Sequence, residues 1–447
     1  MSENEKNNQS DLKQKAKERG KTRKKSSKYE KTKKILNNPQ ISPAEVKLSS
    51  LKGFKILNQL QNIKISNAIG SVIKSKVFNE SENVLVSKLK ESSQKFSIHQ
   101  LVPILAPRDA VGNEVLAIRN ILREEGYDSE IFVETVHPEM SNESKNWLSH
   151  QNNLKADLLI YHHAIGSKLA ALVMNSSSKL VLVYHNITPE KYFEGVNDAI
   201  IKSIQVGREQ LGKLKDKTLL AISHSQFSSA ELKNYGYSKI ITIPFLIDYD
   251  IYKGPINNKL IKKFKKSVNI LFVGRIVPHK RIESLLKIFA YYNSCINPNS
   301  NLFIIGNHIG SEKYYQWLRD IEKKSNLHNV HFVTKSDNVD LATYYKLANV
   351  FLTMSEHEGF GVPLVESMYF GVPIIANKSS AIPEILGKSG IQIQNETPEE
   401  IAEIIDIING NQQLKEEIIK KQESQLKEFD FEKTRSELVR NLRRLLE

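Results

Sequence analysis

The feature that most constrains the fold is an alternation of short apolar runs with longer segments of helical periodicity, which starts near residue 101. Parallel strands are buried on both faces and are joined by crossover helices, so this pattern is typical of a parallel sheet covered by helices. The runs form two series. The strands that we expect are 101–106, 128–134, 156–161, 180–184, 218–223 and 240–244, followed by 269–273, 302–306, 330–333, 350–354, 373–376 and 390–392.

Two such series predict an α/β protein with two Rossmann-like, doubly wound domains, at 99–255 and 256–415. The Lys-rich segment 256–266 lacks strong core-forming periodicity, and we expect it to link the two sheets. A C-terminal helix at 416–447 is expected to pack back on the N-terminal domain. Because ligands of open α/β sheets bind beyond the carboxyl ends of the strands, the two domains should face each other across a central cleft.

The positive charge of the chain is concentrated at its beginning. Residues 1–100 contain 22 Lys and Arg against 9 Asp and Glu, whereas residues 101–447 contain 42 against 41. The net charge of +14 is therefore not a property of the predicted body. Since no base-reading motif accompanies the basic residues, we expect no nucleic-acid partner.

The first hundred residues are predicted to form two parts. Residues 1–48 have almost no apolar side chains, so burial cannot offset the entropy of folding, and we expect a disordered basic tail. Residues 49–98 are expected to be a helical basic extension, because Leu51, Phe54 and Leu57 begin a repeat of apolar residues. Two alternatives stay open: packing of this extension on the body, and contact of residues 1–95 with an anionic membrane.

Two observations bear on the cellular compartment in which the protein is expected. The chain has no apolar stretch of about 18 residues and does not open like a secretory signal. Its single cysteine, Cys295, cannot form an internal disulfide. We therefore expect a cytoplasmic protein, with peripheral contact at the inner face of the membrane as the alternative.

The most informative stretch, SEHEGFGVPLVE at residues 355–366, directly follows an expected strand. Pro363 lies where a helix would begin, so the glycine-rich loop before it would present bare backbone N–H groups to a phosphate. Glu366 would lie in the first turn, where a carboxylate can accept two hydrogen bonds from a vicinal diol. Glu358 would lie on the opposite side of the phosphate. The alternative is that the glycines only turn the chain and both glutamates are solvated.

A second cluster follows the first strand of the second series, where Gly274 and Arg275 are followed by Lys280. Two cations opposite a helix N-terminus would stabilise the charge that builds on a diphosphate leaving group. Taken alone, the same residues would be read as a solvated turn.

Together these clusters resemble the family 4 glycosyltransferases, which are retaining enzymes of the GT-B fold. The resemblance extends over about residues 101–392 and includes Glu358, Glu366 and the G-R…K element at 274–280. Further similar stretches are AIPE with Gly387, YHHAIGS at 161–167, YHNITPEKYF at 184–193 and ISHSQFSSAEL at 222–232. One departure concerns the Gly-Gly turn of the family, where this chain has RDAVGNE at 108–114 and thus an Asp near the expected phosphate site.

The resemblance implies a role for each matched donor-side residue. Arg275 and Lys280 would neutralise the diphosphate, and Glu366 would hold the ribose. Glu358 would contact the transferred sugar and position its anomeric carbon. The backbone amides around Phe360, Gly361 and Val362 would bind the terminal phosphate. Val333 and Thr334 would lie near the nucleotide base.

On the other side of the pocket, His185 directly follows an expected strand, and we expect it to contact the sugar or the incoming hydroxyl, with a buried, hydrogen-bonded histidine as the alternative. Gly112 and His163 are the acceptor-side candidates. The histidines near strand ends also suggest a metal site, but catalytic metals need three converging ligands. Because Arg275 and Lys280 would supply the positive charge, we expect no metal and no cofactor.

These inferences predict a metal-independent, retaining hexosyltransferase that moves a sugar from a nucleotide diphosphate sugar to a glycan or lipid-linked acceptor hydroxyl, in polysaccharide or glycan synthesis. In the mechanism that the resemblance implies, the acceptor attacks the face from which the diphosphate leaves. One alternative is a nucleotide-sugar epimerase of the same architecture, which would carry a different residue set from EGFGVPLVE. The other is a non-catalytic scaffold subunit, which would be expected to lack Arg275, Lys280, Glu358 or Glu366; all four are present.

Overall fold

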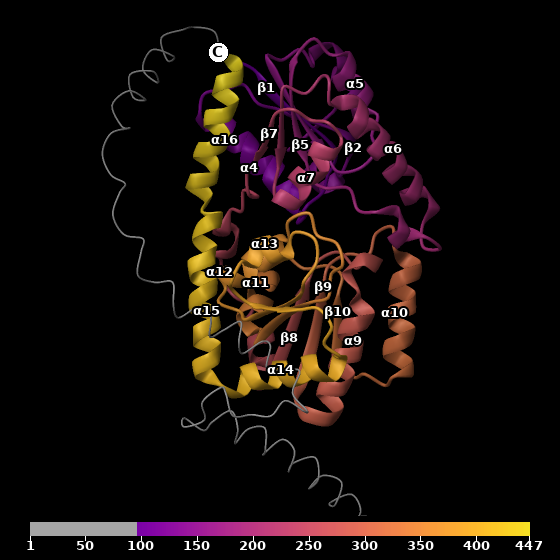
Figure 1. Ribbon diagram of the computed structural model, residues 1–447, viewed down its shortest axis with the longest axis vertical. Coiled ribbons are helices and arrows are strands. Elements are labelled where there is room, and N and C mark those ends of the chain that lie inside the picture. The colour runs from indigo at the N-terminus through magenta and orange to yellow at the C-terminus, as the bar shows by residue number, and fades with distance from the viewer. Residues whose placement is uncertain (1–95) are drawn as a thin grey trace, which may run out of the picture. The chain divides into compact units, whose positions relative to one another are not determined.

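The structure is a computed structural model that describes residues 96–447. The predicted tail at 1–48 and all but the last three residues of the predicted extension at 49–98 lie outside the described residues. The described chain contains two parallel sheets, which belong to one compact unit (Figure 1). The α/β architecture with two doubly wound domains is therefore confirmed.

The first sheet has seven strands in the order β3-β2-β1-β4-β5-β6-β7, and all its pairings are parallel. Its strands are β1 (Ile98–Leu105), β2 (Ile131–Val136), β3 (Lys145–Asn146), β4 (Leu158–His163), β5 (Lys179–Tyr184), β6 (Leu220–Ser223) and β7 (Ile240–Thr242). Its helices are α4 (Ala110–Glu124), α5 (Leu169–Asn175), α6 (Asp198–Leu214) and α7 (Gln226–Asn234), with the short turns η1 (Pro138–Met140), η2 (Leu148–Asn153) and η3 (Glu190–Phe193). Only the two-residue edge strand β3 has no counterpart among the expected strands, because two polar residues give no apolar run.

Strand β5 shows how both faces of the first sheet are buried. Leu180 and Leu182 lie in the core that includes residues of α5 and α6, whereas Val181 and Val183 lie in the core with α4 and the C-terminal helix. Side chains alternate between the faces of a strand, so a continuous apolar run serves two cores at once.

The second sheet has six strands in the order β10-β9-β8-β11-β12-β13, again all parallel. Its strands are β8 (Val268–Val273), β9 (Ser300–Ile305), β10 (Val330–Val333), β11 (Val350–Thr353), β12 (Ile374–Asn377) and β13 (Ile391–Ile393). The accompanying helices are α8 (Asn258–Phe264), α9 (Ile282–Tyr291), α10 (Glu312–Lys324), α11 (Asn338–Leu347), α12 (Val362–Tyr369) and α13 (Ile382–Leu386), with the turns η5 (Pro278–Lys280) and η6 (Tyr292–Ile296).

The connection between the two sheets does not lie at the expected Lys-rich segment 256–266. That segment forms helix α8, whose Phe264 is buried in the core of the second domain and whose Leu260 and Ile261 pack against the same core. It is thus part of the second domain. The connection lies earlier and contains the short turn η4 (Tyr249–Tyr252).

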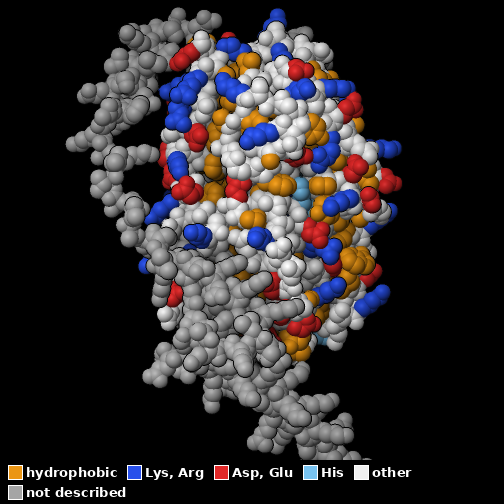
Figure 2. Space-filling view, viewed as in Figure 1, with side chains coloured by type: hydrophobic (Ala, Val, Ile, Leu, Met, Phe, Trp, Pro, Cys, Tyr) orange, Lys and Arg blue, Asp and Glu red, His pale blue; other side chains and the backbone are white. Residues whose placement is uncertain are grey.

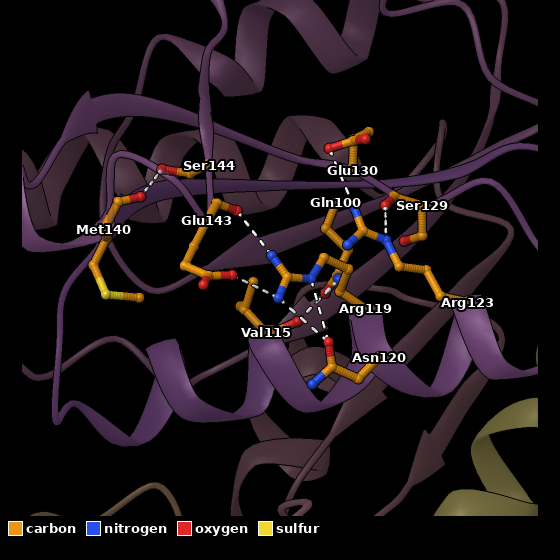
Figure 3. A network of polar contacts seen from close by, with 10 residues as sticks. All are labelled: Gln100, Val115, Arg119, Asn120, Arg123, Ser129, Glu130, Met140, Glu143 and Ser144. Atoms are coloured by element: carbon orange, nitrogen blue, oxygen red, sulfur yellow. Dashed lines mark hydrogen bonds and ion pairs between the residues drawn. The ribbon is translucent and has the colours of Figure 1, made fainter.

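Helix α4 is fixed on the first sheet by side chains that bind the strand side of the domain (Figure 3). Arg119 pairs with Glu143 at 2.7 Å, and the Nε of Arg123 donates to the carbonyl of Ser129 at 2.8 Å. Asp109 caps the helix by accepting from the amide of Gly112. The two arginines thus anchor the middle and the end of α4, and Asp109 caps its start.

The C-terminal helices α14 (Pro398–Gly410), α15 (Gln412–Leu426) and α16 (Phe431–Leu446) serve both domains, with the turn η7 (Lys427–Phe429) before α16 (Figure 1). Gln422 of α15 bonds to the backbone of Val372 and Ile374 in the second domain. Leu438 and Leu442 of α16 lie in a core of the first domain. The chain therefore crosses back at η7, and the expected boundary at 416 lies inside α15.

The surface of the described residues is mixed in charge. Figure 2 shows Lys and Arg side chains interspersed with Asp and Glu over the visible face, as expected from the near balance of 42 basic and 41 acidic residues in 101–447. Among the helices of residues 96–447, none combines the length and the hydropathy that a membrane span requires.

Candidate functional site

Loops at the carboxyl ends of the two sheets touch each other. The hydroxyl of Ser225, which follows β6, donates to the carbonyl of Gly359, which follows β11, at 2.7 Å. The amide of Gln226 donates to a carboxylate oxygen of Glu384 at 2.7 Å. The carboxyl ends of parallel strands are where α/β domains place ligand-binding residues. The candidate site is therefore built from the loops that meet here.

Asn186 is a second contact between the two domains. Its backbone has a positive φ of 63°, and its Nδ2 donates to Glu231 at 3.0 Å, which orients the amide. The Oδ1 of Asn186 therefore accepts from the Nε2 of His357 at 2.6 Å. Burial lowers the pKa of His357 to about 4, so this ring is neutral near pH 7. The HEGFG segment is thus tied to the first domain by an uncharged hydrogen bond.

Glu358 and Lys280 form an ion pair that links two neighbouring strands of the second sheet. The Nζ of Lys280 lies 2.5 Å from Oε1 of Glu358, and the two side chains are only 15% and 14% exposed. The hydroxyl of Ser380 accepts from the amide of Glu358 at 2.7 Å and fixes the loop. The sequence predicted Lys280 as a free cation for a diphosphate, whereas in this arrangement its charge is shared with Glu358.

Arg275 remains exposed at the end of β8, where its guanidinium donates to the carbonyl of Ile309 at 3.2 Å. Its charge also acts on Asp109 of the first domain. Burial raises the pKa of the Asp109 carboxyl, and the nearby Arg275 opposes this rise. Asp109, the Asp near the expected phosphate site, thus caps α4 and lies near a cation.

The start of helix α12 supplies backbone donors. Gly361 caps the helix with a φ of 100°, a conformation that glycine adopts without a Cβ penalty. Within residues 96–447, the amides of Phe360, Gly361 and Val362 donate to no protein acceptor. The ring of Phe360 is buried against Phe245, so this residue faces a ligand through its backbone alone. The local structure therefore has the donors that an anion requires at a helix N-terminus.

Glu366 lies one turn further along α12, and the sequence did not predict its partners. Its Oε1 accepts from the hydroxyl of Tyr252 at 2.5 Å, and its Oε2 accepts from the hydroxyl of Tyr345 at 2.6 Å. Burial raises the pKa of this carboxyl, and the two tyrosine hydrogen bonds oppose the rise. Val333 and Thr334 lie at the carboxyl end of β10, the edge strand of the same sheet, and both are half-buried.

His185 belongs to a buried chain of polar groups in the first domain. Gln100 donates to the carbonyl of Val115 (Figure 3), so its Oε1 must accept from the Nε2 of His162 at 2.9 Å. The Nδ1 of His162 is then an acceptor, and His185 donates to it through Nε2 at 2.9 Å. The His185 side chain is only 2% exposed. Its ring therefore points into the domain, which matches the alternative of a buried, hydrogen-bonded histidine.

Glu114 lies against this chain of polar groups, and no sequence pattern singled it out. Its Oε2 is 3.3 Å from the Nε2 of His224 and 3.9 Å from the Nδ1 of His185. Ligand atoms of Glu114, His162 and His185 all lie within 4.8 Å of one another. Both nitrogens of His162 are already hydrogen-bonded, however, and burial lowers its pKa to about 3. To bind a metal ion together with Glu114 and His185, His162 would therefore have to give up one of its two hydrogen bonds.

The two acceptor-side candidates have structural roles in this arrangement. His163 is fully buried, and its Nε2 donates to the carbonyl of Gly207 in α6 at 2.9 Å. Its side chain therefore points into the core rather than to an acceptor. A Cβ at Gly112 would lie 2.5 Å from the carbonyl oxygen of Ala106, so only glycine lets α4 start this close to β1. Gly112 thus shapes the acceptor side through the backbone.

The sequence also contains an Asp-x-Asp pair, Asp248 and Asp250, in the connection between the sheets. Asp248 caps η4 by accepting from the amide of Asp250 at 2.9 Å. Asp250 pairs with Lys253 at 2.6 Å. Both carboxylates are therefore engaged locally within the connection.

Part of the second domain and of the C-terminal helices is similar to a known family. Residues 256–425 match the glycosyl transferases group 1. The O-antigen chain mannosyltransferase RfbU of Salmonella typhimurium is 23% identical over 215 residues, which are 47% of this chain and 59% of RfbU. The match thus spans about three-fifths of the length of that relative. The predicted relation to glycosyltransferases is confirmed at the level of group 1.

Solved structures share the fold of both domains. Sucrose-phosphate synthase of Thermosynechococcus elongatus superposes with a TM-score of 0.65 at 16% identity, over 78% of this chain and 99% of that chain. HepE of Anabaena, solved with UDP-glucose, gives a TM-score of 0.60 at 18% identity, over 78% and 99% of the two chains. At such identities the likeness shows the fold alone, and that fold is GT-B.

Proposed function

We propose that this chain, whose second domain matches the group 1 glycosyl transferases, moves a sugar from a nucleotide diphosphate sugar to an acceptor hydroxyl with retention of configuration. HepE, solved with UDP-glucose, supports the donor class, and RfbU, an O-antigen chain mannosyltransferase, supports a glycan acceptor. A glycan or lipid-linked acceptor in polysaccharide synthesis is the acceptor class of this proposal.

The observation that carries the proposal is the grouping of Arg275 and the Lys280–Glu358 pair with the unpaired amides at the start of α12. These groups follow β8 and β11, which are neighbours in the second sheet. Backbone donors and fixed cations stabilise charge that develops on a leaving diphosphate, at no cost of reorganisation during the reaction. Glu366, eight residues after Glu358, supplies the carboxylate for the ribose.

The proposed reaction proceeds on one face of the sugar. The anomeric C–O bond to the diphosphate breaks, the acceptor oxygen attacks from the same side, and the acceptor proton passes to the departing phosphate oxygen. Glu358 stabilises the positive charge at the anomeric carbon. Lys280, which the bound diphosphate would share with Glu358, stabilises the leaving phosphate. Since the His185 ring points into the domain and already donates to His162, we assign His185 a supporting role and no proton transfer.

The proposal includes no metal or cofactor at the donor site. Arg275 and Lys280 would provide the charge that a divalent ion supplies to diphosphates in other enzymes. A nucleotide-sugar epimerase on the same architecture would need a different set of residues from EGFGVPLVE. A non-catalytic scaffold is the other alternative, and it would bind no donor.

The test is a panel of nucleotide diphosphate sugars, including UDP-glucose and GDP-mannose, scored by thermal stabilisation of the protein and by release of the nucleoside diphosphate. We expect one donor to raise the melting temperature and to be turned over when a glycan acceptor is added. Arg275→Gln should weaken this stabilisation. Binding of no donor in the panel, or epimerised sugar as the product, would contradict the proposal.

A further inference from the structure

The carboxylate of Glu366 is held at both ends by tyrosines from different parts of the fold. Tyr252 comes from η4 in the connection between the sheets, and Tyr345 comes from α11. All three side chains are buried. Tyr345 stacks on Phe370 with ring centroids 4.9 Å apart and an interplanar angle of 4°, and Tyr252 packs edge-on against the same ring at 5.4 Å. The hydroxyls are therefore fixed in place by packing as well as by the carboxylate.

Two tyrosine hydroxyls do not saturate this carboxylate. An ionised carboxylate offers about four acceptor positions, and each tyrosine occupies one of them. Among residues 96–447 no other donor bonds to this carboxylate, so one position remains on each oxygen of Glu366. A ribose offers two neighbouring hydroxyl donors, which matches the two remaining positions in number.

The hydroxyls of Tyr252 and Tyr345 also influence whether Glu366 is ionised and can accept hydrogen bonds from a ribose. A buried carboxyl tends to protonate, because burial penalises its charged form, and a protonated carboxyl loses acceptor capacity. Burial raises the pKa of Glu366, and hydrogen bonds from Tyr252 and Tyr345 lower it. The pKa values of both tyrosines are raised by burial and by the nearby carboxylate, so their hydroxyls stay protonated and remain donors.

We propose that Tyr252 and Tyr345 are positioning residues that keep Glu366 ionised and direct its free acceptor positions to the two ribose hydroxyls of the nucleotide. This inference rests on the proposed function, because it assigns the donor nucleotide to the site at Glu366. It adds a residue of the interdomain connection, Tyr252, to the parts of the chain that determine donor affinity.

The experiment combines protein variants with ribose variants. Tyr252→Phe and Tyr345→Phe are each titrated calorimetrically with UDP and GDP and with the 2′,3′-dideoxy forms of the same nucleotides. For the nucleotide that binds wild type, we expect each variant to lose about 5- to 15-fold in affinity for the ribose form, the effect of one hydrogen bond. The loss for the dideoxy form should be less than twofold, because the hydroxyls that Glu366 would bind are missing.

The chain offers a matched control in the same domain. The hydroxyl of Tyr314 donates to Glu283 at 2.5 Å, and both residues are buried. Tyr314→Phe should lower thermal stability as the other two changes do, while leaving nucleotide affinity unchanged. This control separates loss of a buried tyrosine–carboxylate bond in general from loss of this bond at Glu366.

A second measurement does not depend on the size of the loss. The ribose-form affinity should fall more steeply towards low pH in both variants than in wild type, because removing one hydrogen-bond donor raises the pKa of Glu366 further.

Equal losses for the ribose and dideoxy forms, or variants with wild-type affinity, would overturn the inference while leaving the proposed function intact. Failure of wild type to bind either nucleotide or any nucleotide sugar would overturn both.

Discussion

The Nζ of Lys280 and the Oε1 of Glu358 are 2.5 Å apart, although the two residues are separated by 78 positions in the sequence. They follow β8 and β11, which pair in parallel register, so the sheet brings the two loops together. If this half-buried ion pair is broken, each residue is left with an uncompensated charge. A nearby anion could compensate the charge of Lys280, so its binding would affect the pair. A bound diphosphate would compete with Glu358 for Lys280 and thereby leave the carboxylate beside the reacting sugar.

The first prediction concerns Glu358→Gln. We expect the turnover number to fall on the order of 100-fold, because the carboxylate stabilises charge that develops only in the transition state. Donor affinity should not fall, because the loss of the Glu358 charge leaves Lys280 available to the diphosphate. The measurement is a donor titration at saturating acceptor, with circular dichroism as the folding control. Normal turnover combined with weakened donor affinity would show that Glu358 is part of the nucleotide site instead.

The second prediction concerns contact between the domains at Gly359. A Cβ there would lie 2.7 Å from the Cβ of Asn186 and 3.1 Å from the carbonyl oxygen of His185. Gly359→Ala should therefore push the loops apart and lower turnover by at least 10-fold, with little change in folding of either domain. Turnover and the radius of gyration by small-angle scattering are the measurements. Gly410→Ala is the control, because a Cβ at Gly410 meets nothing within 4 Å. Equal activity of both variants would contradict the role of this contact.

The strands and the positions of the site loops follow from local sequence patterns, whereas the partners of the site residues depend on long-range packing. The strands were predictable because runs such as LVLVY at 180–184 are apolar at every position, as strands buried on both faces must be. The loops that carry Arg275, Glu358 and Glu366 were predictable because they follow such runs directly.

The partners of these residues were not predictable. Tyr252 binds Glu366 across 114 positions, and neither residue has a pattern that points to the other. The position of His163 was not predictable for the same reason. A histidine at the end of a strand is expected to face the cleft, but helix α6 packs over His163 and buries it. Such contacts depend on how helices pack over the sheet, and no local pattern in a single sequence records this.

The third prediction concerns acid stability and His163. Burial lowers the pKa of His163 to about 4, from an ordinary value of 6.5. A base with a depressed folded pKa stabilises the fold fully above pH 6.5, and this contribution is lost as the pH falls below 6.5, because the unfolded state then binds more protons.

Below pH 6.5 the loss approaches about 1.4 kcal/mol per pH unit for one such group. His163→Gln keeps a donor for the carbonyl of Gly207 but cannot titrate. Between pH 7 and pH 5 the unfolding free energy of this variant should therefore fall by about 2 kcal/mol less than that of wild type. Urea unfolding at both pH values is the measurement, and parallel losses in the two proteins would contradict the prediction.

The fourth prediction concerns divalent ions. Excess EDTA should leave sugar transfer within about twofold of the untreated rate, because in the proposed site Arg275 and Lys280 would supply fixed charge at the diphosphate. Added Mg²⁺ or Mn²⁺ should not raise the rate. Arg275→Gln provides the contrast, since a site that has lost a fixed cation should gain more from added Mg²⁺ than wild type does. Complete loss of transfer in EDTA, restored by Mg²⁺, would show that the donor site needs a metal.

The fifth prediction concerns the basic N-terminal segment. A balance of +13 out of a net charge of +14 lies before residue 101, so contact with an anionic surface should depend on that part of the chain. Deleting residues 1–48 should leave donor hydrolysis unchanged and weaken binding to vesicles that contain phosphatidylserine. The difference should shrink between 50 mM and 500 mM salt, because the ions screen the attraction. Vesicles of phosphatidylcholine alone are the control, and both proteins should bind them equally weakly. Equal binding of the full-length and shortened proteins to the anionic vesicles would show that residues 1–48 have no membrane role.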